Sequence, residues 1–182
     1  YDNNGYKPDG TLEDPAKILG ALLGVTGASL TKGTDTWGAG YTTTSTTEYT
    51  IINNRAFQSN VIAETIGDNL FGESYTTFSA TYYRYDASLK EITLDGITKK
   101  VYAELIDASS TSVTRGSDIW GAGYLTINIT GYIIEHNRAL QSKVYSFTTG
   151  SNLFGESYKT RSDTAYTYKI TPKGFNGKDL YG

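Results

Sequence analysis

The feature that most constrains this chain is an internal repeat. The pentapeptide Trp-Gly-Ala-Gly-Tyr occupies 37–41 and returns at 120–124, and the heptapeptide Asn-Leu-Phe-Gly-Glu-Ser-Tyr occupies 69–75 and returns at 152–158. Both recur at an offset of about 83 residues, and no gap interrupts the register. Between Leu30 and Thr77, roughly three in five positions are identical to their partners. The pattern indicates a tandem duplication, so we expect the two copies to fold alike.

The composition favours strands and excludes several classes of protein. The 182 residues include 16 tyrosines, many threonines and only three prolines, and aromatic and β-branched residues are typical of strands. A net charge of -3 and a pI near 5.2 give no basic surface for nucleic acid. The absence of cysteine excludes disulfides and thiol catalysis, and no apolar run is long enough for a membrane span. This composition predicts an extracellular or cell-surface protein.

Each copy is predicted to begin with a short helix. Asp14 can cap a helix, Pro15 suits the first helical turn, and apolar residues recur at helical spacing until Gly24. The equivalent segment 98–107 repeats this spacing. The predicted organisation is a polar tail over 1–13, unit one over 14–97 and unit two over 98–182. The two units either stand as separate domains or pack as one.

A long strand is predicted after the repeated pentapeptide, over 41–52 in unit one and 124–134 in unit two. Alternate positions on one face of this strand are nearly identical in the two copies. The other face is threonine-rich in unit one and aliphatic in unit two. A period of two is the side-chain period of a strand. With further strands behind it, each unit favours a mainly β fold with antiparallel, sandwich-like sheets and one short helix.

Two surfaces are predicted to contact another molecule or the other unit. The aliphatic side chains of the second long strand would each lose on the order of 1.5–3 kcal/mol of burial if exposed, so unit one or another molecule must cover them. The polar tail cannot form a core, and its backbone groups would find partners at the edge of a neighbour's sheet. The predicted assembly contacts are Tyr1, Tyr6, Leu12, Leu125, Ile127, Ile129 and Ile133.

The aromatic residues of the repeated pentapeptide have two interpretations. They could form a platform on which a sugar ring stacks. Alternatively, they anchor the core around a tight glycine turn, because large aromatic side chains bury much area. We favour the core role. The residues concerned are Trp37, Tyr41, Trp120 and Tyr124.

Charged and oxygen-bearing residues retained in both copies predict ion pairs and leave calcium as an alternative. Structural ion pairs are expected between Arg55 and Glu73 and between Arg138 and Glu156. A nearby set of oxygen donors has the chemistry that Ca²⁺ requires, although its spacing matches no known calcium loop. If no calcium binds, we expect no cofactor. The candidate calcium ligands are Asp35, Asn69, Asp118 and Asn152, together with the two glutamates.

No catalytic pattern is repeated, and we predict that the protein is not an enzyme and has no catalytic residues. The single histidine, His136, stands where the first copy has Asn53. Neither a nucleophile elbow nor a phosphate-binding glycine loop is present.

Two functions from different classes therefore remain. The first is a structural subunit of an extracellular assembly, such as a pilus-like filament, surface layer or matrix fibre, joined to other copies by exchange of a tail or strand. In that case the partner is the protein itself, and removal of residues 1–13 should leave a folded monomer. The alternative is a soluble secreted, lectin-like protein that binds carbohydrate at two equivalent sites.

Overall fold

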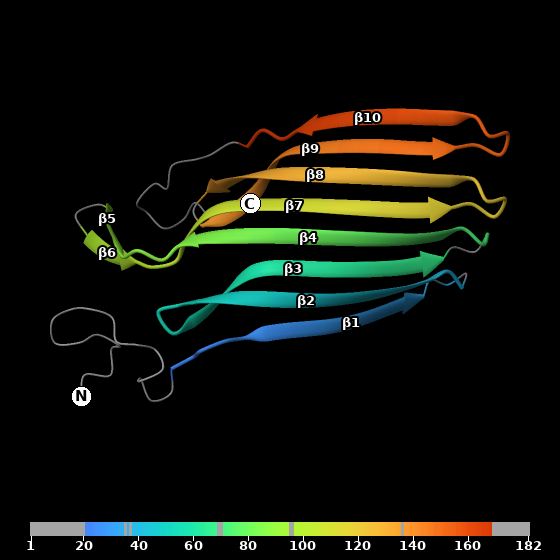
Figure 1. Ribbon diagram of the computed structural model, residues 1–182. Helices are drawn as coiled ribbons and strands as arrows, with labels where there is room; N and C mark the ends of the chain where they lie inside the picture. The colour runs from blue at the N-terminus through green and yellow to red at the C-terminus, as the bar shows by residue number, and fades with distance from the viewer. Residues whose placement is uncertain are drawn as a thin grey trace.

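A computed structural model describes residues 21–34, 36, 38–68, 71–94, 97–135 and 137–168. In this part of the chain the fold is mainly β and contains no helix. One antiparallel sheet has eight strands in the order β1-β2-β3-β4-β7-β8-β9-β10, and β5 and β6 form a separate hairpin (Figure 1). The strands are β1 Thr26–Thr34, β2 Gly40–Ile52, β3 Arg55–Asp68, β4 Ser74–Asp86, β5 Lys90–Leu94, β6 Ile97–Val101, β7 Glu104–Ser117, β8 Gly123–Glu135, β9 Arg138–Ser151 and β10 Ser157–Ala165.

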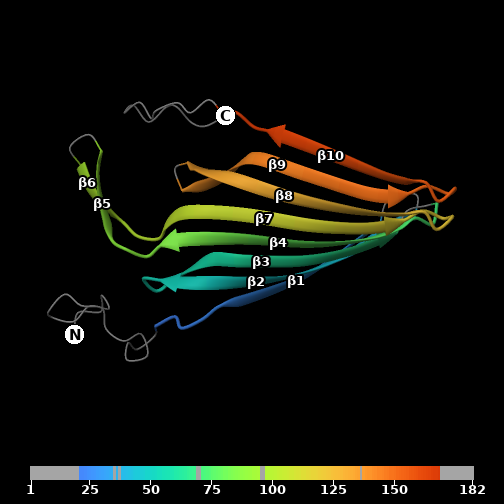
Figure 2. The ribbon, with the colours of Figure 1, turned by 45° about the horizontal axis from the view of Figure 1, so that its top comes forward.

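The eight strands lie in a single layer. Figures 1 and 2 show them side by side, with the β5–β6 hairpin beyond the end of β4 and β7. Since β4 pairs directly with β7, the strands of unit two continue the sheet of unit one instead of packing over it. The expected sandwich is therefore not formed by the described strands, and no described strand of one unit covers a face of the other.

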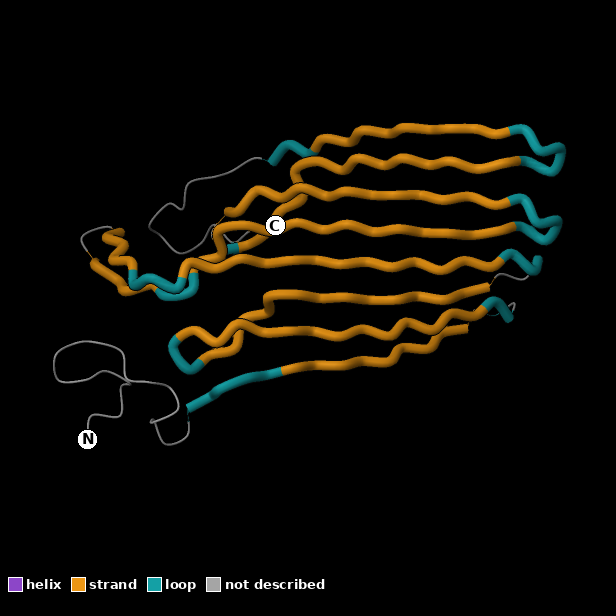
Figure 3. The backbone as a smooth tube through the Cα atoms, in the orientation of Figure 1, coloured by secondary structure: helices purple, strands orange, loops and turns teal. Residues whose placement is uncertain are grey.

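The helix expected over 98–107 is wrong, because strands occupy most of this segment (Figure 3). Ile97–Val101 forms β6 and Glu104 begins β7. Valine, tyrosine and isoleucine in this segment suit strand pairing, and pairing with neighbours outweighs the local helical spacing. Most of the first expected helix, residues 14–20, lies outside the described residues, as does the tail over 1–13. Residues 21–25 lead into β1 without regular secondary structure.

The strands of the two units begin at equivalent places in the repeated sequence. β2 begins at Gly40 and β8 at Gly123, while β3 and β9 begin at Arg55 and Arg138. A β-bulge follows Glu48 in the β2–β3 pair and Gly131 in the β8–β9 pair, again at equivalent positions. The positions of strands and irregularities thus follow the repeat in the sequence.

Asparagine turns close one end of the sheet. Asn53 and Asn54 connect β2 to β3 with φ values of 56° and 59°, and Asn137 precedes β9 with a φ of 63°. Asparagine tolerates this left-handed region better than most residues. The Asn54 side chain also accepts the backbone N–H of Leu22, and the Asn137 side chain accepts that of Leu105. The first turn is thereby tied to the segment that precedes β1, and the second to the start of β7.

The only well-buried apolar side chains among the described residues lie near this asparagine end. They are Ile52, Ala103, Leu105 and Ala108. Nearby, the Phe57 and Tyr85 rings lie 5.3 Å apart between centroids. No large side chain in the described part of the chain is completely buried. The long middle of the sheet must therefore be stabilised mainly by contacts between side chains of neighbouring strands.

Candidate assembly surfaces

The register of the strand pairs aligns threonines into one row across the whole sheet. Hydroxyl groups in this row lie 2.8 Å apart between Thr43 and Thr65 and 2.9 Å apart between Thr77 and Thr114. The Thr126 and Thr148 hydroxyls, also 2.9 Å apart, make the third pair. Such cross-strand pairs help to hold strands in register. The row consists of Thr31, Thr43, Thr65, Thr77, Thr114, Thr126, Thr148 and Thr160.

The next row alternates glycine and tyrosine. A Cβ added to any of its glycines would lie between 2.4 and 2.5 Å from the nearest ring atom of the following tyrosine. Each ring therefore lies across the bare backbone of the neighbouring strand, which requires glycine there and covers the peptide groups that glycine exposes. The row runs Gly33, Tyr41, Gly67, Tyr75, Gly116, Tyr124, Gly150 and Tyr158.

These two rows belong to one uncharged face, which we call the hydroxyl face. It comprises the side chains at Gly27, Ser29, Thr31 and Gly33 of β1 and the residues that the register aligns with them on the other strands. Its residue types are glycine, alanine, serine, threonine, valine, asparagine and tyrosine. Neighbouring serine hydroxyls also bond, as between Ser29 and Ser45 at 2.8 Å. The face is mostly polar and without charge.

The opposite side of the sheet carries an exposed apolar patch, which we call the apolar face. Phe78, Val113, Ile127 and Phe147 are consecutive neighbours across β4, β7, β8 and β9. Phe78 is 53% exposed and Phe147 is 44% exposed. A shallow hollow of about 320 Å³ opens beside them. The apolar face consists of Ile62, Ile66, Phe78, Val113, Leu125, Ile127, Ile129, Tyr145 and Phe147.

The structure brings together the apolar residues that the sequence analysis placed on the second long strand, and it extends the patch. Leu125, Ile127 and Ile129 lie on the apolar face of β8, while Ile133 follows the bulge. The described strands of unit one do not cover them; instead β3 and β4 add their own apolar side chains beside them. The other predicted contacts, Tyr1, Tyr6 and Leu12, lie outside the described residues.

Within the described part of the chain, the sheet ends in two open edges. Among the described strands, β1 and β10 each pair with a neighbour on one side only. Every residue of β10 and most residues of β1 are exposed. An open edge presents unpaired N–H and C=O groups to any strand that can align with it. β10 carries an ion pair on this edge, between Arg161 and Asp163 at 3.0 Å.

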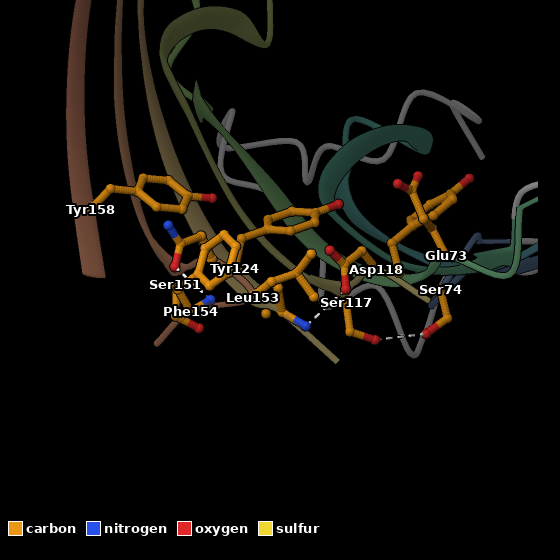
Figure 4. A pocket seen from close by; sticks show the side chains of 13 residues that line it. Glu73, Ser74, Ser117, Asp118, Tyr124, Ser151, Leu153, Phe154 and Tyr158 are labelled. Atoms are coloured by element: carbon orange, nitrogen blue, oxygen red, sulfur yellow. Dashed lines mark hydrogen bonds between the residues drawn. The ribbon is translucent and has the colours of Figure 1, made fainter. Parts of the chain in front are cut away.

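The turns at the other end of the sheet enclose an open hollow of about 590 Å³. Figure 4 shows residues from three successive turns converging on it, with Glu73, Asp118 and Phe154 among them. Asp118 Oδ1 accepts the backbone N–H groups of Trp120 and Ala122 at 3.0 and 2.8 Å.

Asn152 has the same structural role in its own turn. Its Oδ1 accepts the N–H groups of Phe154 and Glu156 at 3.0 and 2.9 Å, and its Nδ2 donates to Glu156 Oε2 at 2.6 Å. Asp118 and Asn152, two of the predicted calcium ligands, thus close turns. Within the described ranges no group of three or more histidine, cysteine, aspartate or glutamate side chains could hold a metal ion. The other two predicted ligands, Asp35 and Asn69, lie outside those ranges.

The repeated aromatic residues that the structure describes do not anchor a core. Trp120 is 69% exposed, and Tyr41 and Tyr124 lie across glycines on the hydroxyl face. Trp37 lies outside the described residues. The core role favoured from the sequence is therefore wrong for Trp120, because a single-layer sheet offers no interior at this end.

The predicted ion pairs are also wrong. Arg55 begins β3 and Glu73 follows the far end of the same strand, which has 14 residues and so spans roughly 45 Å. Arg138 and Glu156 have the same relation on β9. Repetition in both units indicated a shared structural role, but it did not indicate contact between the two residues.

The small core at the asparagine end perturbs two tyrosines. Burial raises the pKa of Tyr83 above its ordinary 10.0, and the neighbouring Tyr132 adds to the increase. Burial likewise raises the pKa of Tyr85, with Tyr83 contributing. Both side chains lie on the same side of β4 as the hydroxyl face and come directly after its last row. The hydroxyl face therefore ends at the small core.

Comparison with protein families, curated proteins and solved structures found no match. Among the residues that the structure describes, no helix is long and apolar enough to cross a membrane. The geometry of the sheet is thus the basis for a functional proposal. Neither the edges of the sheet nor its threonine row was predicted. The sequence did contain a signal for the row, because alternate positions of the long strand are identical in the two copies.

Proposed function

We propose that the protein is a structural subunit of an extracellular assembly, in which the sheet of one copy continues into the next through pairing of β10 with β1. The observation that carries this proposal is the junction between β4 and β7 inside the chain. β10 begins at the position equivalent to the start of β4, and β1 is equivalent to the second half of β7. The free edges therefore correspond to two strands that already pair.

The internal junction supplies the register for this contact. Thr77 pairs with Thr114. In the repeat, Thr160 is equivalent to Thr77 and Thr31 is equivalent to Thr114, so Thr160 of one copy would pair with Thr31 of the next. Threonine hydroxyl pairs occur at the β2–β3, β4–β7 and β8–β9 junctions, which is every second junction of the sheet. A β10–β1 junction is the next place in this alternation, so the threonine row would continue from copy to copy.

A contact of this kind is head-to-tail and does not close on itself, so repetition produces a filament or an extended layer. The strands would lie across its long axis and the backbone hydrogen bonds along it. A pilus-like filament, a surface layer or a matrix fibre all fit this geometry. A chain without cysteine or methionine also suits an extracellular material, because it contains no oxidation-sensitive sulfur.

Charged residues on the edges oppose this pairing. Lys159 would lie opposite Lys32 of the next copy, where the internal junction has Thr76 opposite Arg115. Two like charges directly opposite each other cost about 0.2–1 kcal/mol. Assembly should therefore strengthen as added salt screens the two lysines.

Paired charges at the proposed contact test it. Thr31 and Thr160 lie on opposite edges, roughly 34 Å apart in one chain, so substitutions at the two positions can interact only between copies. We expect the native chain to form polymers, the Thr31→Lys, Thr160→Lys variant to lose them, and the Thr31→Lys, Thr160→Glu variant to recover them. Sedimentation velocity and negative-stain microscopy would measure this. A native chain that never polymerises, or a double-lysine variant that polymerises equally, contradicts the proposal.

Removal of residues 1–13 separates edge pairing from exchange of the tail. Edge pairing predicts that the shortened chain still forms polymers, whereas tail exchange predicts a folded monomer. A native chain that stays monomeric at every concentration would favour carbohydrate binding instead. The hollow lined by Tyr124 and Phe154 would then be the place to test.

A further inference from the structure

Edge pairing leaves the apolar face exposed and makes it longer with each added copy. Ile129 is 53% exposed and Ile66 is 55% exposed, and their neighbours across β3 to β9 continue the patch. Exposed apolar patches of this extent mark surfaces that contact another molecule. A second contact, made by the face of the sheet and not by its edges, is therefore needed.

We infer that the apolar face binds the same face of a second copy, related to the first by a two-fold axis parallel to the strands. The product is a two-layered sheet whose apolar side chains lie between the layers and whose hydroxyl faces point outward. Sheets that pack face to face lie about 10 Å apart with nearly aligned strands. The inference concerns a different surface from edge pairing and does not depend on it.

Charge complementarity identifies the second copy as the partner. Between the bulges and the opposite turns, the apolar side of the sheet carries different charges on its two halves. On the β1–β4 half they are Lys32, Glu48, Glu64, Asp68 and Arg84. On the β7–β10 half they are Asp107, which pairs with Arg84, and Arg115, Lys143, Lys159, Arg161 and Asp163. One half is thus net negative and the other net positive. A two-fold axis along the strands lays the negative half of each copy over the positive half of its partner.

The area is that of a stable interface. Eight strands are roughly 34 Å wide, and nine aligned residues are roughly 30 Å long, so each face measures about 1,000 Å². Two such faces would bury about 2,000 Å² in total, which is the upper part of the range for standard specific interfaces.

The strand register predicts which residues meet. An axis between β4 and β7 places β3 over β8 of the partner, so that Ile62 faces the partner's Ile129. The same axis places β2 over β9 of the partner. Glu48 and Lys143 occupy the same row of the sheet, so Glu48 then faces the partner's Lys143. Within one chain these two residues are separated by roughly 24 Å, which is too far for a direct contact.

The first experiment uses the Thr31→Lys, Thr160→Lys variant, in which edge pairing is blocked. Light scattering after size exclusion should show a dimer. The chain itself supplies the disrupting substitutions, because β2 has threonine at the positions equivalent to 125, 127 and 129. Adding Leu125→Thr, Ile127→Thr and Ile129→Thr should convert the dimer to a monomer with an unchanged circular dichroism spectrum. Thr126→Ser with Thr130→Ser, on the hydroxyl face, is the control and should leave the dimer intact.

The second experiment exchanges the facing charges in the same edge-blocked chain. Glu48→Lys or Lys143→Glu alone should weaken dimerisation by about tenfold, and the two together should restore it. Restoration can only come from contact between copies, given the separation within one chain. A monomeric edge-blocked chain, a threonine-substituted chain that dimerises equally well, or a double exchange that does not recover overturns the inference. None of these results bears on polymers formed by the native edges, so the two proposals fail separately.

Discussion

The two faces of the sheet differ in how closely the two units agree. On the hydroxyl face, β2 and β8 carry nearly the same residues at equivalent positions, including Tyr41 and Tyr124. On the other face, β2 carries threonines where β8 carries Leu125, Ile127 and Ile129, although the two strands have the same length and the same bulge. The residues of the hydroxyl face thus satisfy a requirement that all strands share. The residues of the opposite face differ with the position of the strand in the sheet.

The common requirement is register. In a sheet with one buried face, burial itself selects the register, because a slip of one residue exposes every apolar side chain. A single layer lacks that constraint over most of its length. Rows of matched side chains replace it in this sheet: hydroxyl pairs such as Thr77 with Thr114, and rings laid over glycines such as Tyr124 over Gly116.

The largest expected effect comes from a side chain added beneath a ring of the hydroxyl face. In Gly116→Val the new Cβ would lie 2.4 Å from Tyr124, so the ring must leave its place, and we expect a loss of about 2 kcal/mol in the free energy of unfolding. Gly131→Val, on the other face, is the control. Its Cβ would lie 3.6 Å from Ser142 Oγ, and it should be neutral or stabilising by under about 1 kcal/mol.

Urea denaturation in the edge-blocked background would measure both glycine variants. Equal losses at the two positions would mean that the tyrosine rings do not distinguish the faces.

A smaller effect is expected from loss of one hydroxyl in the threonine row. Thr77→Val leaves the Thr114 hydroxyl without its partner at 2.9 Å, which should cost about 1 kcal/mol, and Thr77→Val with Thr114→Val should recover part of that loss. Thr111→Val, an exposed position on the apolar side, should change stability by under about 0.5 kcal/mol. A double-mutant cycle of urea midpoints measures the coupling. Additive losses would show that the two hydroxyl groups do not stabilise the sheet by interacting with each other.

The smallest effect is a pH dependence at the end of the hydroxyl face. The pKa values of Tyr83 and Tyr85 are raised above 10.0 in the folded protein, mainly by burial. The unfolded chain therefore loses these phenol protons first. The contribution of these two tyrosines to the free energy of unfolding is fully present below about pH 10. It is lost as the pH rises through their folded-state pKa values. Urea midpoints between pH 8 and roughly pH 11 should decrease less in Tyr83→Phe than in Tyr82→Phe, the control on the other side of β4. Equal decreases would contradict this.

The long strands β2 and β8 were predictable from the sequence, because a side-chain period of two is a local pattern. The single layer was not. Apolar side chains such as Ile127 and Ile129 indicated that another surface must bury this face of the strand. The sandwich was predicted on the assumption that the other unit provides that surface. The pairing of β4 with β7 places that unit beside them instead.

Other errors have equally specific causes. The spacing of Val101, Leu105 and Ile106 fits a helix, yet it also fits a hairpin followed by a strand, and pairing decides between them. The threonine row depends on the register of every strand pair together, and no single strand reveals it. Identical residues at alternate positions, such as Thr43 and Thr126, were visible in the sequence. Their alignment across the sheet depends on the turns between strands, which set the register.

The most direct test of the central claim, that one copy's β10 pairs with β1 of the next in the register of the internal junction, is a disulfide between copies. The chain contains no cysteine, so Thr31→Cys with Thr160→Cys introduces the only thiols. Directly opposed residues have Cα atoms about 4.5–5.5 Å apart, within reach of a disulfide. Ser29→Cys with Thr160→Cys shifts the pair by two residues, to about 7–8 Å, beyond that reach. Mild oxidation should give a ladder of covalent oligomers on a non-reducing gel for the first variant only. No ladder, or equal ladders from both variants, would contradict the account.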